Sequence, residues 1–177
     1  MTFKMRPYQQ DAIDNVYSQW LLGKRFVVLV MPTGAGKAAC LCEIARLEGE
    51  RGQRVLITAH RQELITQLSL TLAKFGLNHQ VIAAKSTVKY ATRLHMEIVG
   101  RNYVDPNSRI IVASVQSVKP EQIKTLSAFG NKLTIIGDEF HHYTKQSQTW
   151  GKVFTPLDDA GARGLGLTAP TFTGSHL

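Results

Sequence analysis

Cysteine, proline and long apolar segments are scarce in this sequence of 177 residues. Its two cysteines, Cys40 and Cys42, lie in an apolar helical segment without neighbours that would complete a zinc site, so we expect buried free thiols. No apolar run reaches the roughly 18 residues that a membrane-spanning helix needs. The charged N-terminus, residues 1–6, does not resemble a secretory signal peptide. We therefore expect a protein that is cytoplasmic or nucleoid-associated, not secreted, with no membrane contact.

Acidic residues are also few: 13 Asp and Glu stand against 21 Lys and Arg, for a net charge of +8. The excess is concentrated between Arg51 and Arg109, where nine basic residues face three acidic ones. Such a local excess favours a polyanionic partner, most often nucleic acid. A solvated basic face that only aids solubility is the alternative, and charge alone does not decide between them.

Short apolar segments alternate with amphipathic ones along the whole chain. This pattern predicts an α/β domain with a mainly parallel sheet covered by helices on both faces. The expected strands are 26–31, 55–59, 81–84, 110–113, 133–137 and 165–168, and the expected helices are 6–22, 37–50, 62–75, 120–129 and 146–154. The six consecutive apolar residues of segment 26–31 predict a central strand buried on both faces. Segment 85–107 shows no clear pattern, and residues 1–170 read as one domain.

A glycine-rich loop follows the first apolar segment and opens a helix. In Gly34-Ala35-Gly36-Lys37, the glycines allow backbone N–H groups to approach phosphate oxygens, and the lysine can reach the β- and γ-phosphates. Two positions depart from the strict phosphate-loop pattern. Met31 stands in place of the first glycine, and Ala38 in place of the Ser or Thr whose hydroxyl binds Mg²⁺. We therefore expect nucleotide binding with slow hydrolysis.

Two adjacent carboxylates follow the fifth expected strand. Asp138 can hold the Mg²⁺ of a bound nucleotide, and Glu139 can orient the attacking water. Ligands of open α/β sheets bind at the carboxyl ends of the strands, which is where this pair lies. His141 and His142 come next; we expect a hydrogen bond across the site rather than zinc binding.

Together these segments resemble the first RecA-like motor domain of superfamily 2 helicases of the DEAD/DEAH type. The resemblance is strongest to the branch with type III restriction subunits and with XPB-like and RadD-like DNA helicases. It implies a three-layer RecA-like P-loop NTPase fold that uses ATP and Mg²⁺ and contacts a nucleic acid backbone. DNA is the expected partner and RNA the alternative.

The resemblance assigns roles residue by residue. The catalytic residues would be Lys37, Asp138 and Glu139, and His141 and Thr168 would couple the two sites. The nucleotide would be bound by Arg6, Gln9, Pro32, Thr33, Gly34, Ala35, Gly36, Lys37 and Ala38. Nucleic acid would be bound by His60, Arg61 and Gln62 of motif Ia and by Ser114, Gln116 and Ser117 of the next motif.

The resemblance is incomplete at the C-terminal end. After Thr168-Ala169 the chain departs from the usual Thr-Ala-Thr-Pro-Phe-Arg continuation, and the second RecA-like domain, which supplies a catalytic arginine, is absent. We therefore expect residues 171–177 to form a disordered tail, and the chain, as a monomer, to be poorly active alone. One alternative is a nucleotide- or nucleic-acid-binding module without hydrolysis, acting as a regulator. Another is a small-substrate kinase, against which segments 60–62 and 138–141 argue.

Overall fold

The computed structural model describes residues 4–31, 36–138 and 148–168. The helices are α1 (Pro7–Leu21), α2 (Lys37–Glu50), α3 (Gln62–Lys74), α4 (Lys85–Leu94), α5 (Pro120–Ser127) and α6 (Gln148–Asp159). The strands are β1 (Phe26–Val30), β2 (Arg54–Ala59), β3 (Gln80–Ile82), β4 (Ile110–Ser114), β5 (Leu133–Asp138) and β6 (Arg163–Thr168). None of the described helices is both long and apolar enough to cross a membrane.

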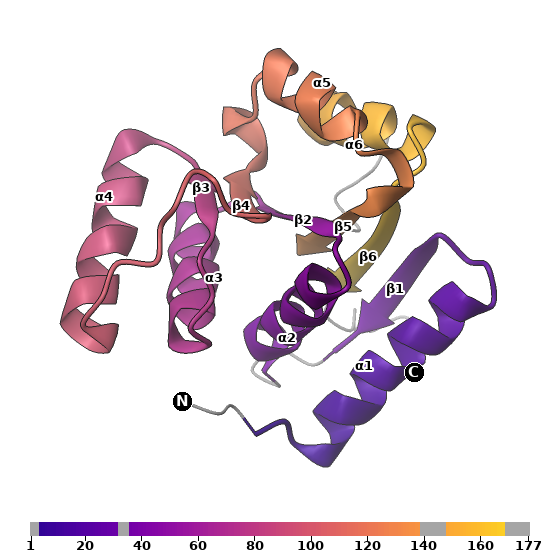
Figure 1. The fold of residues 1–177 in the computed structure, drawn as a ribbon, viewed down its shortest axis with the longest axis horizontal. Helices are drawn as coiled ribbons and strands as arrows, with labels where there is room; N and C mark the ends of the chain where they lie inside the picture. Colours follow the sequence, from indigo (N-terminus) through magenta and orange to yellow (C-terminus); the bar gives the residue numbers. More distant parts are fainter. Residues whose placement is uncertain (1–3, 32–35, 139–147, 169–177) are drawn as a thin grey trace, which may run out of the picture.

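All six strands form one parallel sheet in the order β1-β6-β5-β2-β4-β3. This confirms the predicted α/β architecture, with α1, α2 and α3 below the strands and α5 and α6 above them in Figure 1. Each face has its own apolar core, because alternate residues of a strand point to opposite faces. On β2, for example, Ile57 packs with the helices of the first group and Leu56 with those of the second.

The position of β1 corrects one prediction. Among the described residues this strand pairs only with β6, so it lies at an edge of the sheet rather than at its centre. Val27 is buried against α1 and α2, but Val28 and Val30 on the other face are each 56% exposed. The apolar run identified a strand correctly, whereas burial of its second face depends on which elements pack there.

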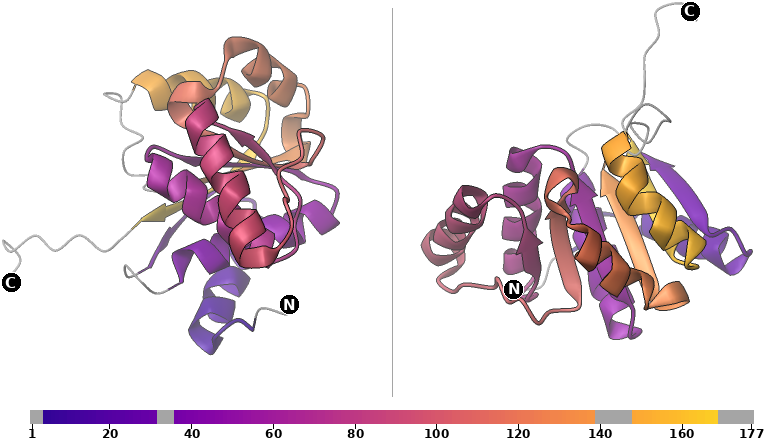
Figure 2. Two further views of the ribbon diagram at one scale, coloured as in Figure 1. Left: turned by 90° about the vertical axis from the view of Figure 1, so that its left-hand side faces the viewer. Right: turned by 90° about the horizontal axis from the view of Figure 1, so that it is seen from above.

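Segment 85–107, which the sequence left unassigned, is mostly helical. α4 packs beside α3 at one end of the molecule and continues into a π-helix, His95–Val99 (Figure 2). Behind it, the fully buried Ser69, His79 and His95 form a hydrogen-bond chain. The Ser69 Oγ atom lies 2.7 Å from His79 Nε2 and 2.9 Å from His95 Nε2, which ties α3, β3 and the π-helix together.

The partners of the two imidazoles indicate where their protons lie. His95 Nδ1 accepts the N–H of Tyr103 at 3.1 Å, so its proton is on Nε2 and faces Ser69. His79 Nδ1 lies 2.9 Å from the Leu77 carbonyl, so its proton is there and its Nε2 accepts from Ser69. Burial lowers the pKa of His79 to about 4 and also lowers the pKa of His95. Both rings are therefore neutral at pH 7. Along the chain, His95 donates to Ser69, Ser69 donates to His79, and His79 donates to the Leu77 carbonyl.

A second buried polar cluster lies at the amino ends of the strands. Glu48 is fully buried, and the Arg163 guanidinium donates to both of its oxygens, at 2.7 and 2.8 Å. Thr134 and Tyr17 also donate to this carboxylate, at 2.6 and 2.9 Å. Arg163 in addition stacks on the Trp20 ring, 4.2 Å from its centroid. The cluster joins α1, α2, β5 and β6 through groups that satisfy one another.

Candidate nucleotide and nucleic-acid site

The predicted site residues that the structure describes gather at the carboxyl edge of the sheet. Across that edge, Thr168 of β6 pairs with Val30 of β1, and its carbonyl accepts the N–H of Met31 at 2.9 Å. On the other side of β6, Leu167 pairs with Asp138, the last residue of β5. The entry to the phosphate loop and the acidic strand end are therefore separated by a single strand, which carries Thr168.

The described end of the phosphate loop begins α2. Gly36 has φ of +80°, a left-handed conformation that glycine adopts readily, and Lys37 is the first residue of the helix. A Cβ atom on Gly36 would lie 2.0 Å from Nε2 of Gln9, so the glycine makes room for that amide. Pro32, Thr33, Gly34 and Ala35 lie outside the described residues.

Gln9 of α1 thus packs against the described end of the predicted phosphate loop. Its side chain is largely buried, with 7% of the residue exposed, and its Oε1 accepts the N–H of Arg6 at 2.9 Å. This bond fixes the amide next to the position where α2 begins, while Arg6 itself is exposed. The structure therefore brings two predicted nucleotide-binding segments together.

The remaining nucleotide-site residues are described unequally. Ala38 is half-buried and packs against the core, and its methyl side chain has no oxygen for a metal ion. Asp138 is placed by its backbone at the end of β5. Glu139 and His141 lie outside the described residues, as does His142.

The predicted nucleic-acid residues form a connected group at the same edge. Ser114, at the end of β4, pairs with Ala59 at the end of β2, which places the two motifs side by side. The Ser114 hydroxyl donates to Gln116 Oε1 at 2.6 Å, and Gln116 Nε2 donates to the His60 carbonyl at 3.4 Å. Gln62 Nε2 lies 3.5 Å from Ser114 Oγ. Side chains of one motif therefore position the backbone of the other.

Two further predicted residues flank this group. Arg61 is exposed at the N-cap of α3, where the helix N-terminus and the guanidinium together suit a phosphate. Ser117 is half-buried in the short 3₁₀ turn that follows β4.

Thr87 is a member of this group that the sequence did not indicate. Its hydroxyl donates to Gln62 Oε1 at 2.5 Å and so links α4 to motif Ia. The available signal was the spacing of small residues: Thr87 and Ala91 are four apart and form the buried side of α4. The exposed basic residues around them, Lys85, Lys89 and Arg93, obscured it.

The basic stretch is not one continuous surface. Arg51 stacks on Tyr17 and Arg54 on Phe129, with guanidinium–ring distances of 4.4 Å in both cases. Both arginines flank the start of β2, at the opposite edge from Arg61. Only part of the excess charge therefore lies beside motif Ia.

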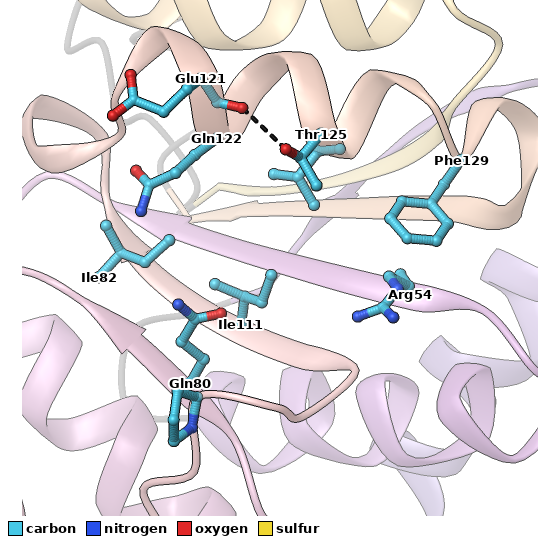
Figure 3. Close-up of a pocket in the computed structure, with 10 residues that line it drawn as sticks. Arg54, Gln80, Ile82, Ile111, Glu121, Gln122, Thr125 and Phe129 are labelled. Carbon is cyan, nitrogen blue, oxygen red and sulfur yellow. Dashed lines mark hydrogen bonds between the residues drawn. The ribbon is translucent and has the colours of Figure 1, made fainter.

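A cavity of about 340 Å³ lies on the α5 face and contains none of the predicted site residues (Figure 3). Ile82 and Ile111 of the sheet lie across from Gln122 and Thr125 of α5, and Arg54 lies beside Phe129 at one end.

Cys40 and Cys42 are fully buried and free, as predicted. Burial raises the pKa of the Cys40 thiol to about 11, so this thiol is not a reactive thiolate.

Comparison with known proteins points to one family. Residues 2–172 match the family described as type III restriction enzyme, res subunit. The chain is 28% identical over 147 residues to a protein of Schizosaccharomyces pombe provisionally described as the mitochondrial ATP-dependent helicase irc3, and 28% identical over 152 residues to its counterpart IRC3 of Saccharomyces cerevisiae. In both cases 81% of this chain is covered, but only 22% and 20% of the relative.

Solved structures share the fold. The type ISP restriction-modification enzyme LlaGI, solved with a DNA substrate mimic, superposes with a TM-score of 0.65 at 19% identity, over 95% of this chain and 18% of the other. The phage T4 helicase UvsW gives a TM-score of 0.61 at 20% identity, over 93% of this chain and 31% of the other. These similarities confirm the RecA-like helicase fold predicted from the motifs.

Proposed function

The chain belongs to the family of type III restriction enzyme res subunits, and we propose that it is the ATP-binding half of an ATP-dependent DNA helicase or translocase. One observation carries the proposal. Two features lie at the same edge of one sheet. One is the start of α2, where Gln9 packs against Gly36, and the other is the pair of motifs that Gln62 and Ser114 connect. A nucleotide and a nucleic acid strand bound there would lie on one rigid platform.

At the nucleotide end, Mg²⁺ bound with ATP would offset phosphate charge. Lys37 and the N–H groups at the start of α2 would hold the phosphates, and Gln9 would contact the adenine or fix the loop that surrounds it. Asp138 would hold the metal ion, and Glu139 would orient the attacking water and accept its proton. Thr168, on the strand between the loop and Asp138, would sense the nucleotide and transmit its state, together with His141.

At the nucleic-acid end, recognition would go through the backbone and be independent of base sequence. Arg61 and the N-terminal N–H groups of α3 would bind one phosphate, and Gln116 and Ser117 would bind a neighbouring one. We favour DNA over RNA because LlaGI, which has the same fold, was solved with a DNA substrate mimic.

The chain spans about a fifth of the curated relatives that it matches, so the activity of a whole motor goes beyond it. We propose that a second RecA-like domain completes the nucleotide site with an arginine and completes the strand track. Without that domain the chain would bind ATP weakly, hydrolyse it slowly and separate no duplex. Residues 1–170 would form the ATP-binding domain.

Two titrations test the proposal. Lys37→Ala should abolish binding of a fluorescent ATP analogue and leave binding of labelled single-stranded DNA unchanged. Arg61→Gln should weaken binding of the single-stranded DNA and leave binding of the ATP analogue unchanged. It should also reduce the slope of log DNA affinity against log salt concentration by about one. Lys24→Ala and Lys132→Gln, at exposed sites on the opposite edge, are the matched controls. The proposal would be refuted if the chain bound neither ligand, or if the control substitutions weakened binding as much as Lys37→Ala and Arg61→Gln do.

Ala38 separates the motor from the regulator alternative. If the chain is a motor with a weakened metal site, Ala38→Thr should raise its rate of ATP hydrolysis, and Glu139→Gln should abolish that gain. If neither substitution changes the rate of ATP hydrolysis, the result would favour a module that binds nucleotide or nucleic acid without hydrolysing ATP.

A further inference from the structure

A shallow hollow of about 210 Å³ lies between the amino-terminal parts of α3 and α4. Its lining residues are Gln62, Glu63 and Thr66 of α3 and Ser86, Thr87 and Tyr90 of α4. Cofactor sites usually measure about 300–1,000 Å³, so this space is too small for a nucleotide cofactor. It has room for one planar ring.

The hollow has an aromatic wall. Tyr90 lines it and is 46% exposed, so its ring is accessible to a ligand. It lies on the flank of α4 that faces α3, whereas Thr87 and Ala91 make the packed side. Packing of α4 therefore does not use the ring.

The polar lining suits a base better than a phosphate. The Glu63 carboxylate would repel a phosphate, but it can accept a hydrogen bond from the exocyclic amine of a base. The Ser86 hydroxyl and the Gln62 amide add a donor and an acceptor at the rim.

The hollow is joined to the strand-binding residues and bordered by cations. Gln62, which lines it, bonds both Thr87 and Ser114. On α4, Lys85, Lys89 and Arg93 recur every four residues and are exposed, and the Arg93 guanidinium lies 5.8 Å from the Tyr90 ring centroid. An aromatic side chain next to a positively charged path is the arrangement by which proteins hold single strands.

We propose that this hollow receives one unstacked base of the strand bound at motif Ia, with the Tyr90 ring as its stacking partner and Lys85 and Lys89 near the adjoining phosphates. The inference rests on the proposed nucleic-acid function and adds a base subsite beyond its backbone contacts. The hollow would mark where the strand leaves the sheet edge and turns across α4.

An abasic scan tests the subsite. Labelled single-stranded DNA of the shortest length that binds with full affinity, which leaves no room for a shift of register, is prepared with a single abasic residue moved along it. Affinities are measured for the wild type and for Tyr90→Ala, Tyr90→Phe and Met96→Ala. Met96, on the π-helix, is also apolar and is 53% exposed, so it is the matched control.

For the wild type, one abasic position should lower affinity by at least about fivefold, the lower end of the range for one stacked base. Tyr90→Ala should weaken the intact strand by the same factor and remove the sensitivity at that position. Tyr90→Phe should keep both, because it keeps the ring, and Met96→Ala should behave as the wild type.

Failure of the subsite is distinguishable from failure of the proposed function. If the wild type binds the strand, Arg61→Gln weakens it, and the abasic scan is flat in all variants, the subsite is refuted and the backbone track stands. If Tyr90→Ala weakens all abasic strands and the intact strand equally, Tyr90 acts through the fold and the subsite is also refuted. If the wild type binds no strand, the proposed function itself fails.

Discussion

The two edges of the sheet contrast in how their polar groups are used. At the amino edge Glu48 is fully buried, and its two oxygens accept from Arg163, Thr134 and Tyr17. At the carboxyl edge Arg61, Gln62 and Gln116 are exposed, although Gln62 and Gln116 also bond to neighbouring groups. The polar groups of the amino edge stabilise the fold, whereas those of the carboxyl edge remain available to a ligand.

This division means that stability and binding should respond to different substitutions. Changes at the amino edge should lower the free energy of unfolding without changing ligand affinity in molecules that remain folded. Changes at the carboxyl edge should have the opposite effect. The following predictions test that separation.

The largest effect is expected from Glu48→Ala. It leaves the Arg163 guanidinium without its buried carboxylate and should lower the free energy of unfolding by about 3–5 kcal/mol. Urea unfolding measures the loss. Glu50→Ala removes an exposed ion pair with Arg46 and should cost under about 1 kcal/mol. Equal costs for the two variants would contradict the contrast between the edges.

A pH effect should follow from His79, which precedes β3 at the amino edge. Its pKa is about 4 in the folded protein against an ordinary value of 6.5, so the unfolded chain binds a proton below pH 6.5 that the folded chain does not. Stability is therefore full above pH 6.5 and falls as the pH drops towards 4. From pH 7 to pH 5 this group should lower the free energy of unfolding by about 1–2 kcal/mol.

Urea unfolding at pH 7, 6 and 5 checks this. In His79→Gln the fall between pH 7 and pH 5 should be smaller by that amount, whatever the absolute stability of the variant. An unchanged slope would show that His79 does not titrate as its burial requires.

At the carboxyl edge, Gly36→Ala should separate binding from stability. The left-handed backbone costs an alanine about 1–2 kcal/mol, and the new Cβ would displace Gln9. Gly76→Ala carries the same backbone cost, with φ of +76°, but its Cβ would meet nothing within 4 Å. Both variants should unfold at similar urea concentrations, and only Gly36→Ala should lose the fluorescent ATP analogue. Retained nucleotide binding would separate Gln9 from the nucleotide site.

The smallest change in stability is expected for Gln62→Ala. Gln62 is exposed and its bonds to the buried Thr87 and Ser114 are partly buried, so their loss should cost about 1 kcal/mol. Binding of single-stranded DNA should weaken several-fold, because α4 and β4 lose their shared link to motif Ia. Gln67→Ala, an exposed glutamine further along α3, is the control and should leave binding unchanged.

Sequence reasoning located the strands well because a parallel sheet buries continuous apolar segments, as in β2, β4 and β5. It failed at β1, where the same signal accompanied a half-exposed edge strand. Which face of a strand is covered depends on helices that pack from elsewhere in the chain, and a local pattern does not contain that information. It also left α4 unassigned, because Thr87 and Ala91 are small and the exposed residues around them are basic.

The candidate site was predicted at the level of segments rather than contacts. The glycines and Lys37 predicted a phosphate loop, because few other residue types allow backbone to surround a phosphate. The contact of Gln9 with Gly36 and the bond of Gln62 to Ser114 could not be predicted, because both depend on the packing of α1 and on the register of β2 with β4. Tyr90 carried no motif and became visible only through its exposure.

The edge position of β1 has a consequence for the timing of nucleotide capture. Within the described residues one ladder, to β6, holds the strand that leads into the phosphate loop, whereas β2 is held by β4 and β5. Amides of β1 should therefore exchange with solvent sooner than those of β2. A nucleotide bound next to the end of β1 should slow that exchange most at β1. The exchange rate of the β1 amides would thus report when the site is filled.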